Sequence, residues 1–367
     1  MQLAGSTTNL GLAMADSPHH DDAGKTLILS IKEDVINLKQ KSEEVLQSIA
    51  FRAMIFFQII AYGSYSILVH LCEENHAIAF SSTAMNFILE FVKLCFSFIG
   101  VIYSSTTIKF SPDLPQYVAW FRQSLPYSMP AILYFINNNL AVHMQLYMDP
   151  ASYQILANFK IFTTAILYRL LIKHKLSRQQ WFALSLLFFG GLAYSIGTIK
   201  NSSLTSKRST TSSTQMREMY IHPFGIPMIA IYCTLSGLAG VYNEYILKKH
   251  YSESLHLQNL FLYSYGTILN FIPAMGSAIV ALHTTRSFNP LRGFSFYTWL
   301  IVVTQALNGL FMSVVIKHSS NIIRLFVISF SLIVTAVLSY FIFHINFNIY
   351  FFISFVTMTC ALSLYYS

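Results

Sequence analysis

The side chains that could do chemistry gather in one stretch, residues 134–164. Lys160 lies near the middle of an apolar segment, and Tyr153 stands seven positions, or two helical turns, before it on the same face. A lysine at membrane depth costs roughly 2.5–3.5 kcal/mol, so such a residue usually marks a substrate pathway. The ammonium suits a phosphate, and the tyrosine ring offers a nucleobase a stacking surface. The alternatives are a lysine that snorkels to the surface and a tyrosine that anchors a helix end.

Three consecutive asparagines, Asn137, Asn138 and Asn139, interrupt the preceding apolar segment. In a helix their side chains point in different directions, so one can hydrogen-bond a neighbouring helix, at about 0.6–2 kcal/mol, while another faces a cavity. Together with Lys160, the asparagines predict a wet cavity that receives an anionic guest.

Acidic residues inside apolar segments are few, and two of them leave alternatives open. Glu90 and Lys93 are three positions apart, so they share a helix face and can neutralise each other. They form either a structural pair that lets the segment insert or a part of the substrate cavity. Glu244 stands near Lys248 at the end of its segment, where it is either a solvated cap residue or a gate.

The C-terminal half adds polar positions inside apolar segments: Asn259, Tyr263 and Asn308. Arg324 stands at the start of another segment, just after Ser319-Ser320-Asn321, which could cap that helix. A helix N-terminus with an arginine makes an anion site. We therefore expect Arg324 and Lys160 to clamp a diphosphate from opposite halves of the chain.

Composition excludes several classes of function. The 367 residues are 54% hydrophobic and 10% charged, whereas a soluble domain is about 25% charged, so we expect an all-α polytopic membrane protein. The net charge of +8 is dispersed over short loops, with no basic stripe to bind nucleic acid. No nucleophile elbow, Walker loop or metal-spaced histidine pair is present, so we expect no enzyme, no cofactor and no metal site.

Ten apolar segments of about the length that crosses a bilayer predict ten transmembrane helices. They cover residues 50–71, 80–103, 125–146, 150–171, 179–198, 221–246, 256–282, 295–316, 319–343 and 345–365. The excess of Lys and Arg in alternate connections puts both termini in the cytosol. Residues 1–49 then form a cytosolic, partly disordered tail, and residues 199–220 form a luminal Ser/Thr-rich loop. In that loop, Asn201 begins a glycosylation sequon.

Ten helices divide naturally into two sets of five. Since five is odd, the halves would be inverted copies, as in many transporters that bind their substrate between two such repeats. This expectation rests on the count and on analogy with that transporter architecture.

Several stretches resemble the nucleotide-sugar transporter family, in particular the solute-carrier-35 A subfamily and its A4 branch of UDP-sugar transporters. They read NNNLAVHMQLYMDPASYQILANFKI, LYRLLIKHKLSRQQW, SGLAGVYNEYILKK, LQNLFLYSYGTILN and TQALNGLFMSVVIKHSSNIIRLF. The resemblance implies a drug/metabolite-transporter-like fold of ten helices in a 5+5 inverted repeat. It also implies a Golgi or endoplasmic reticulum antiporter that exchanges a cytosolic nucleotide sugar for a luminal nucleoside monophosphate.

The same resemblance implies roles for single residues. Tyr153 and Lys160 fall where relatives contact the nucleotide, and Asn138 and Asn139 fall where relatives have a paired asparagine. Two more, Asn259 and Tyr263, match positions near the base in CMP-sialic acid transporters. Relatives often have a lysine at the position of Arg324.

The substrate class follows from one missing motif. The GDP-sugar signature GALNK is absent, so the resemblance favours a pyrimidine nucleotide, as a UDP-sugar or a CMP- or CDP-linked sugar or alditol. The alternative is a transport-inactive relative that acts as a membrane scaffold. Either protein could form homo- or hetero-oligomers with related transporters.

Overall fold

The fold is known from a computed structural model, which divides into two compact units, Met1–Ala53 and Met54–Ser367. The structure describes residues 48–74, 77–78, 80–104, 114–144, 147–148, 150–173, 175–208, 222–285, 291, 293–344 and 347–367. The predicted cytosolic tail, apart from its last two residues, therefore lies outside the described part. Apart from residues 48–53, which begin the first helix, everything described below lies in the second unit.

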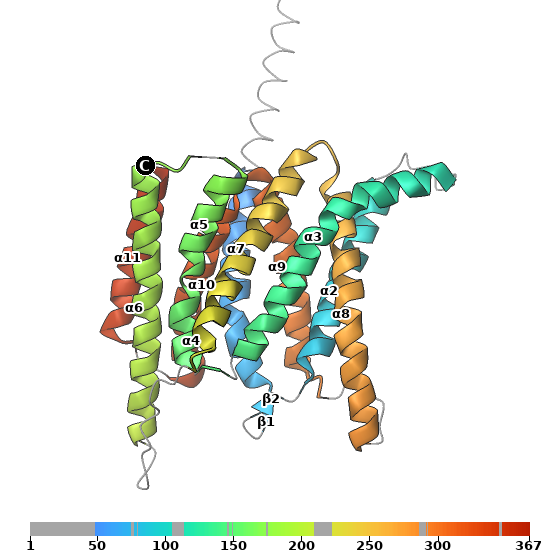
Figure 1. The fold of residues 1–367 in the computed structure, drawn as a ribbon. Coiled ribbons are helices and arrows are strands. Elements are labelled where there is room, and N and C mark those ends of the chain that lie inside the picture. Colours follow the sequence, from blue (N-terminus) through green and yellow to red (C-terminus); the bar gives the residue numbers. More distant parts are fainter. Residues whose placement is uncertain are drawn as a thin grey trace, which may run out of the picture. The chain divides into compact units, whose positions relative to one another are not determined.

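Helices make up almost all of the described chain (Figure 1). After a first helix, Ser48–Leu71, come α2 Ser82–Ser104, α3 Leu114–Met144, α4 Pro150–Ala157, α5 Lys160–Leu171, α6 Arg178–Arg208, α7 Gly225–Lys249, α8 Leu255–Thr285, α9 Phe296–His318, α10 Asn321–Phe343 and α11 Ile349–Tyr366. Two strands of two residues each, β1 Glu73–Glu74 and β2 Ala77–Ile78, pair antiparallel between the first two helices.

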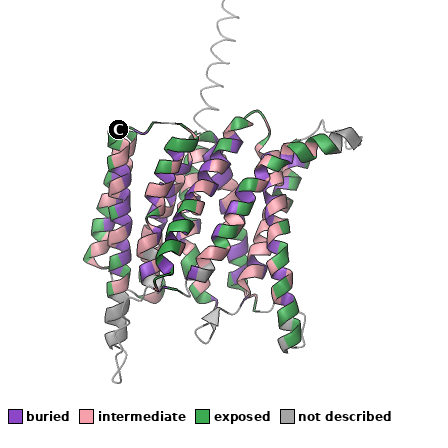
Figure 2. Ribbon diagram, viewed as in Figure 1, coloured by how far each residue is buried: buried purple, intermediate pink, exposed green. Residues whose placement is uncertain are grey.

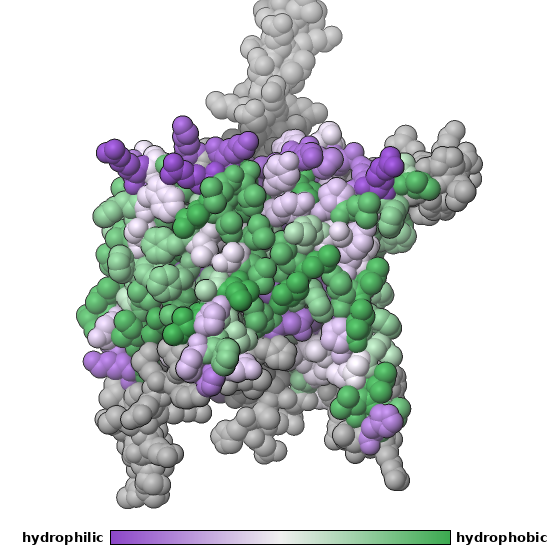
Figure 3. Space-filling view, viewed as in Figure 1, coloured by the Kyte–Doolittle hydropathy of each residue, from purple (hydrophilic) through white to green (hydrophobic). Residues whose placement is uncertain are grey.

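Seven described helices are long and apolar enough to cross a membrane: the first helix, α2, α6, α7, α9, α10 and α11. Large apolar side chains are exposed along them, for example Phe91, Phe182 and Phe352. Figure 3 shows such side chains over the middle of one face, with hydrophilic residues gathered at the end where the C-terminus lies. The protein is therefore a polytopic helical membrane protein.

The predicted helix at 150–171 is interrupted. Asn158 and Phe159 form turns whose backbone N–H groups bind the carbonyls three residues back, Ile155 at 3.2 Å and Leu156 at 3.0 Å. This tight 3₁₀ geometry separates α4 from α5. The prediction of one continuous helix is wrong, and Lys160 begins α5 instead of lying inside a helix.

The predicted loop at 199–220 begins later than expected. The residues up to Arg208 continue α6, and this stretch contains neither Gly nor Pro to stop a helix. Asn201 therefore lies on a helix backbone and not in a loop. Its side chain and residues 209–220 lie outside the described part.

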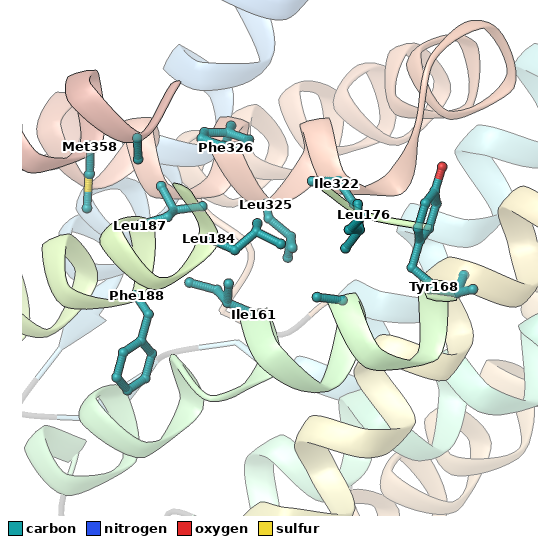
Figure 4. Packing of buried hydrophobic residues seen from close by; sticks show 13 residues of the cluster. Ile161, Tyr168, Leu176, Leu184, Leu187, Phe188, Ile322, Leu325, Phe326 and Met358 are labelled. Atoms are coloured by element: carbon teal, nitrogen blue, oxygen red, sulfur yellow. The ribbon is translucent and has the colours of Figure 1, made fainter. Parts of the chain in front are cut away.

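The helices pack mainly across the two halves of the sequence. The closest partners are α6 with α11, α2 with α8, α3 with α7 and α8, and α5 with α7. A buried apolar cluster joins α5, α6, α10 and α11 through side chains that include Ile161, Leu184, Leu325 and Met358 (Figure 4). Buried residues line the inner sides of the helices and exposed ones the outer sides (Figure 2). The interior faces thus carry the polar residues considered next.

Candidate functional site

A cavity of about 280 Å³ lies among α2, α3, α8, α9 and α10. Six of the residues selected from the sequence line it: Glu90, Lys93, Asn138, Tyr263, Asn308 and Arg324. They come from five helices, two in the N-terminal and three in the C-terminal half of the sequence, and the fold brings them together.

Glu90 and Lys93 form a partly buried ion pair at the wall of this cavity. The Lys93 Nζ lies 2.5 Å from Glu90 Oε1 and 4.5 Å from the ring centre of Tyr263. Two glycines on neighbouring helices leave space for the side chains of this pair. A Cβ at Gly266 would lie 2.8 Å from Glu90 Oε2, and one at Gly309 would lie 3.0 Å from Lys93 Cδ. The pair is thus neutralised within its own helix and also lines the cavity.

Arg324 is the cation of this cavity that keeps an unused donor. Its Nη1 donates to the hydroxyl of Tyr134 at 3.1 Å, and its guanidinium carbon lies 5.7 Å from the centre of that ring. Its Nε is buried and has no hydrogen-bond partner among the described residues. A buried charged donor without a partner costs free energy, which an anionic guest would recover.

Lys160 lines a second, smaller pocket of about 160 Å³. Tyr153 and Tyr232 lie beside it, with their ring centres 5.8 Å apart, and Ser195 and Ser329 add hydroxyl groups. None of the described carboxylates forms an ion pair with the Lys160 ammonium. The pocket is thus a second place where an amine meets aromatic and hydroxyl side chains.

Helix α10 stands between the two pockets. Arg324 lines the larger cavity, whereas the next residue, Leu325, lines the smaller pocket together with Ser329. No described residue lines both. The structure therefore does not bring Lys160 and Arg324 to one space, and the expected diphosphate clamp is not assembled in it.

The remaining predicted positions line neither pocket. Asn139 donates to the carbonyl of Phe135 in its own helix at 2.8 Å, so its amide is used locally. Asn259 is only 2% exposed, and its Oδ1 lacks a partner among the described residues. Asn137 is also buried, and its Oδ1 likewise has no hydrogen-bond partner among the described residues. Of the three consecutive asparagines, only Asn138 reaches the cavity.

Sequence reasoning missed several cavity residues, and the polar ones among them are Tyr62, Tyr134, Asn243 and Ser313. Tyr134 stands four positions, or one turn, before Asn138 and so shares its face, a signal that the sequence did contain. Tyr62 shows no such signal, because an aromatic residue in an apolar segment is equally typical of a membrane interface.

The junction between α9 and α10 also differs from the prediction, in which Ser319-Ser320-Asn321 caps α10 and Glu244 is either a solvated residue or a gate. Glu244 is fully buried, so it is no solvated cap residue. Ser320 occupies the N-cap position of α10, but its side chain makes no capping hydrogen bond. The reason is that a carboxylate from α7 takes this place, since Glu244 Oε2 accepts from the backbone N–H of Asn321 at 2.7 Å.

Among the described residues, no three His, Cys, Asp or Glu side chains come close enough to hold a metal ion. The groups that line the cavity are a cation with a spare donor, an ion pair, amides and tyrosines, all of which can hydrogen-bond or stack against a polar guest.

Comparisons with known proteins agree on one family. The family model described as "Nucleotide-sugar transporter" matches residues 44–366. The chain is 37% identical to "Probable UDP-sugar transporter protein SLC35A4" of Xenopus tropicalis, over 89% of this chain and 94% of that protein. It is 36% identical to the Homo sapiens protein of the same name, over 85% of this chain and 93% of that one.

A solved crystal structure has the same fold. It covers 86% of this chain and 96% of its own, with a TM-score of 0.57 and 9% sequence identity. At this identity the likeness concerns the arrangement of helices alone.

Proposed function

Because the chain belongs to the nucleotide-sugar transporter family, we propose that it exchanges a cytosolic pyrimidine nucleotide sugar for a luminal nucleoside monophosphate across the Golgi or endoplasmic reticulum membrane. The family is one of transporters and not of enzymes. The names of its SLC35A4 relatives support a UDP-sugar as the guest. A CMP- or CDP-linked sugar or alditol is the other pyrimidine choice.

The observation that carries the proposal is the state of Arg324. A guanidinium with an unpaired, buried Nε faces a polar cavity inside an apolar helical unit. Such a group is expensive to keep without a function, and a phosphate offers it a charge-assisted hydrogen bond. We assign the phosphate to Arg324 and the rest of the nucleotide sugar to Asn138, Asn308, Tyr263 and the Glu90–Lys93 pair.

Lys160 and Tyr153 form a separate subsite in this proposal. Their pocket holds an amine, two tyrosine rings and two serine hydroxyls, a set that suits another polar part of the guest. Asn139 and Asn259 line neither of these two pockets, and we assign them a supporting place behind the site.

Ten membrane spans in a 5+5 inverted repeat fit the packing. If α4 and α5 form one interrupted span, α2 and α8 are the second spans of the two halves, and α6 and α11 are the fifth. Helices α2 and α8 are in close contact, and so are α6 and α11. A two-fold axis in the membrane plane relates the two halves of an inverted repeat, so corresponding helices that lie next to this axis pack against each other. With both termini cytosolic, the two halves would rock about the cavity in alternating access.

Ligand stabilisation of the purified protein tests this function. We expect UMP or CMP and their sugar conjugates to raise the unfolding temperature, and GMP to leave it unchanged. A ligand at a hundred times its Kd stabilises by about 2.7 kcal/mol, which such a measurement detects. Stabilisation by no nucleotide at all would contradict the proposal and favour a membrane scaffold.

Exchange is then measured in vesicles that are loaded with the nucleoside monophosphate. The variant Arg324→Gln should lose uptake of the nucleotide sugar and, without ligand, unfold at no lower a temperature than the wild type, because it removes an unpaired buried donor. The matched control is Arg169→Gln, because Arg169 is an exposed arginine in the last turn of α5. Uptake by empty vesicles at the same rate would contradict exchange.

A further inference from the structure

Glu244 holds the first turn of α10 from the neighbouring helix α7. Its Oε2 accepts from the backbone N–H of Asn321, the first residue of α10, and the hydroxyl of Tyr168 on α5 also binds this carboxylate. The first N–H groups of a helix lack partners within the helix and attract negative charge. A carboxylate from another helix therefore replaces the local cap.

Lys248 stands one turn after Glu244 and binds the other side of the same turn. Its Nζ donates to Glu244 Oε1 at 2.6 Å and to the carbonyl of Ser319, the residue that follows α9. An ammonium at the C-terminal end of one helix and a carboxylate at the N-terminal end of the next both match the helix dipoles. One ion pair of α7 thus fastens α9 and α10 at their junction.

The surface of α7 is shaped for this contact. A Cβ at Gly240, one turn before Glu244, would lie 2.6 Å from Asn321 Nδ2. A side chain at position 240 would therefore require the amide group of Asn321 to move. The close approach and the two charged contacts therefore concern the same turn of α10.

This contact lies at one end of the larger cavity. Arg324 follows Asn321 by three positions, about one turn, and lines the cavity, as do Asn243 beside Glu244 and Ile316 one turn before Ser319. Since neighbouring helices alternate in direction, it is the end at which α7 and α9 finish and the C-terminus lies (Figure 1). A movement of α10 away from α7 would therefore open this end and carry Arg324 with it.

We propose that Glu244, Lys248, Ser319 and Asn321 form a latch that closes this end of the cavity and positions Arg324. The latch opens and closes in each transport cycle, a statement that rests on the proposed function. Glu244 and Lys248 are positioning residues and do not contact the guest. Gating contacts of this kind control access in many carriers.

The experiment measures access to the cavity without any transport. Ile316 is 2% exposed, and the variant Ile316→Cys places a thiol inside the closed end. A water-soluble maleimide reacts with the purified protein, and peptide mass spectrometry gives the labelling rate at position 316. The additional change Glu244→Gln removes the charge that holds Lys248 and Asn321, and we expect it to raise this rate about tenfold or more.

Lys249→Gln is the matched control, because Lys249 is the exposed neighbour of Lys248. This substitution should leave the labelling rate at position 316 unchanged. Should Glu244→Gln not fold, Lys248→Gln carries the same expectation, because its side chain is 36% exposed and tolerates exchange. An unchanged labelling rate in the folded Glu244→Gln or Lys248→Gln variant would overturn the latch.

A second measurement tests the positioning of Arg324. The ratio of the affinity for the nucleoside monophosphate to that for the nucleoside reports on the phosphate contact. Glu244→Gln should reduce this ratio about tenfold, while the affinity for the nucleoside stays constant. An equal loss for both ligands would mean that Glu244 has only a structural role. If the wild type binds no nucleotide, the proposed function fails, but the labelling result still decides whether the latch exists.

Discussion

Lys93 and Tyr263 form a cation–π contact in which the ammonium lies 4.5 Å from the ring centre, while Glu90 holds the same ammonium at 2.5 Å. The charge of Lys93 is thus satisfied before any guest arrives. Arg324, on the same cavity, keeps a donor that no described residue uses. The two cations of the cavity therefore differ: the ammonium of Lys93 is already paired with a carboxylate, whereas the guanidinium of Arg324 keeps a donor available.

The first prediction concerns the ion pair between Glu90 and Lys93. Lys93→Met leaves Glu90 as an uncompensated carboxylate, which costs about 3–5 kcal/mol in a buried site. Since the side chains are 11% and 18% exposed, we expect the lower end of that range for the free energy of unfolding. The double variant Glu90→Gln, Lys93→Met should regain most of the loss in thermal unfolding. A double variant as unstable as Lys93→Met would contradict this account.

The second prediction uses two glycines of one helix. In Gly266→Ala the new Cβ would lie 2.8 Å from Glu90 Oε2, so the pair must shift, and overpacking of this kind costs about 1–3 kcal/mol. Gly276→Ala, also on α8, is the control, because nothing lies within 4 Å of its Cβ. It should be neutral or stabilising by up to about 1 kcal/mol, since alanine favours helix. Equal melting temperatures of the two variants would refute the close contact.

The third prediction concerns Lys160 and Arg324, which line different pockets. If each binds its own part of the guest, the losses in binding free energy of Lys160→Gln and Arg324→Gln should add to within about 0.3–0.5 kcal/mol. Isothermal calorimetry with the nucleotide sugar on both single variants and the double variant measures this. A larger coupling energy would show that both cations reach the same phosphate, as the sequence had led us to expect.

The positions of most helices were predictable, because apolar runs of bilayer length dominate this sequence. The interruption after Ala157 was not, since Asn158-Phe159 contains neither Gly nor Pro and the turn is fixed by carbonyls of the preceding helix. For the same reason the prediction placed Lys160 in mid-helix, whereas it begins α5.

The site was predictable only as a set of polar residues. Which of them share a cavity depends on how each helix is rotated about its axis. A single sequence does not show whether Asn138 or its neighbour Asn139 is on the side of α3 that faces the cavity. Glu244 stands at the end of a span, where water is normally available, yet it is buried because α10 brings its unpaired N–H groups to it. Such a partner is 77 residues away in the chain.

The last prediction concerns Lys317, which lies in the last turn of α9 and is 5% exposed. Its Nζ donates to the carbonyl of Glu253 at 2.6 Å and to Gln258 Oε1 at 3.0 Å, and Gln258 in turn donates to the carbonyl of His250 at 2.7 Å. The ammonium thus fastens the α7–α8 turn to the end of α9.

Lys317→Met keeps the aliphatic stem and removes these donors, so the carbonyl of Glu253 and the Oε1 of Gln258 lose a charge-assisted partner worth about 1.5–3 kcal/mol. We expect faster hydrogen exchange of residues 250–254 by roughly tenfold to a hundredfold, with the centre of α9 unchanged. Lys249→Met, at an exposed position of the same region, should leave the exchange of the turn as it is. Unchanged exchange in Lys317→Met would mean that the turn is held by its own backbone bonds, such as that from Glu253 N to His250 O at 3.1 Å.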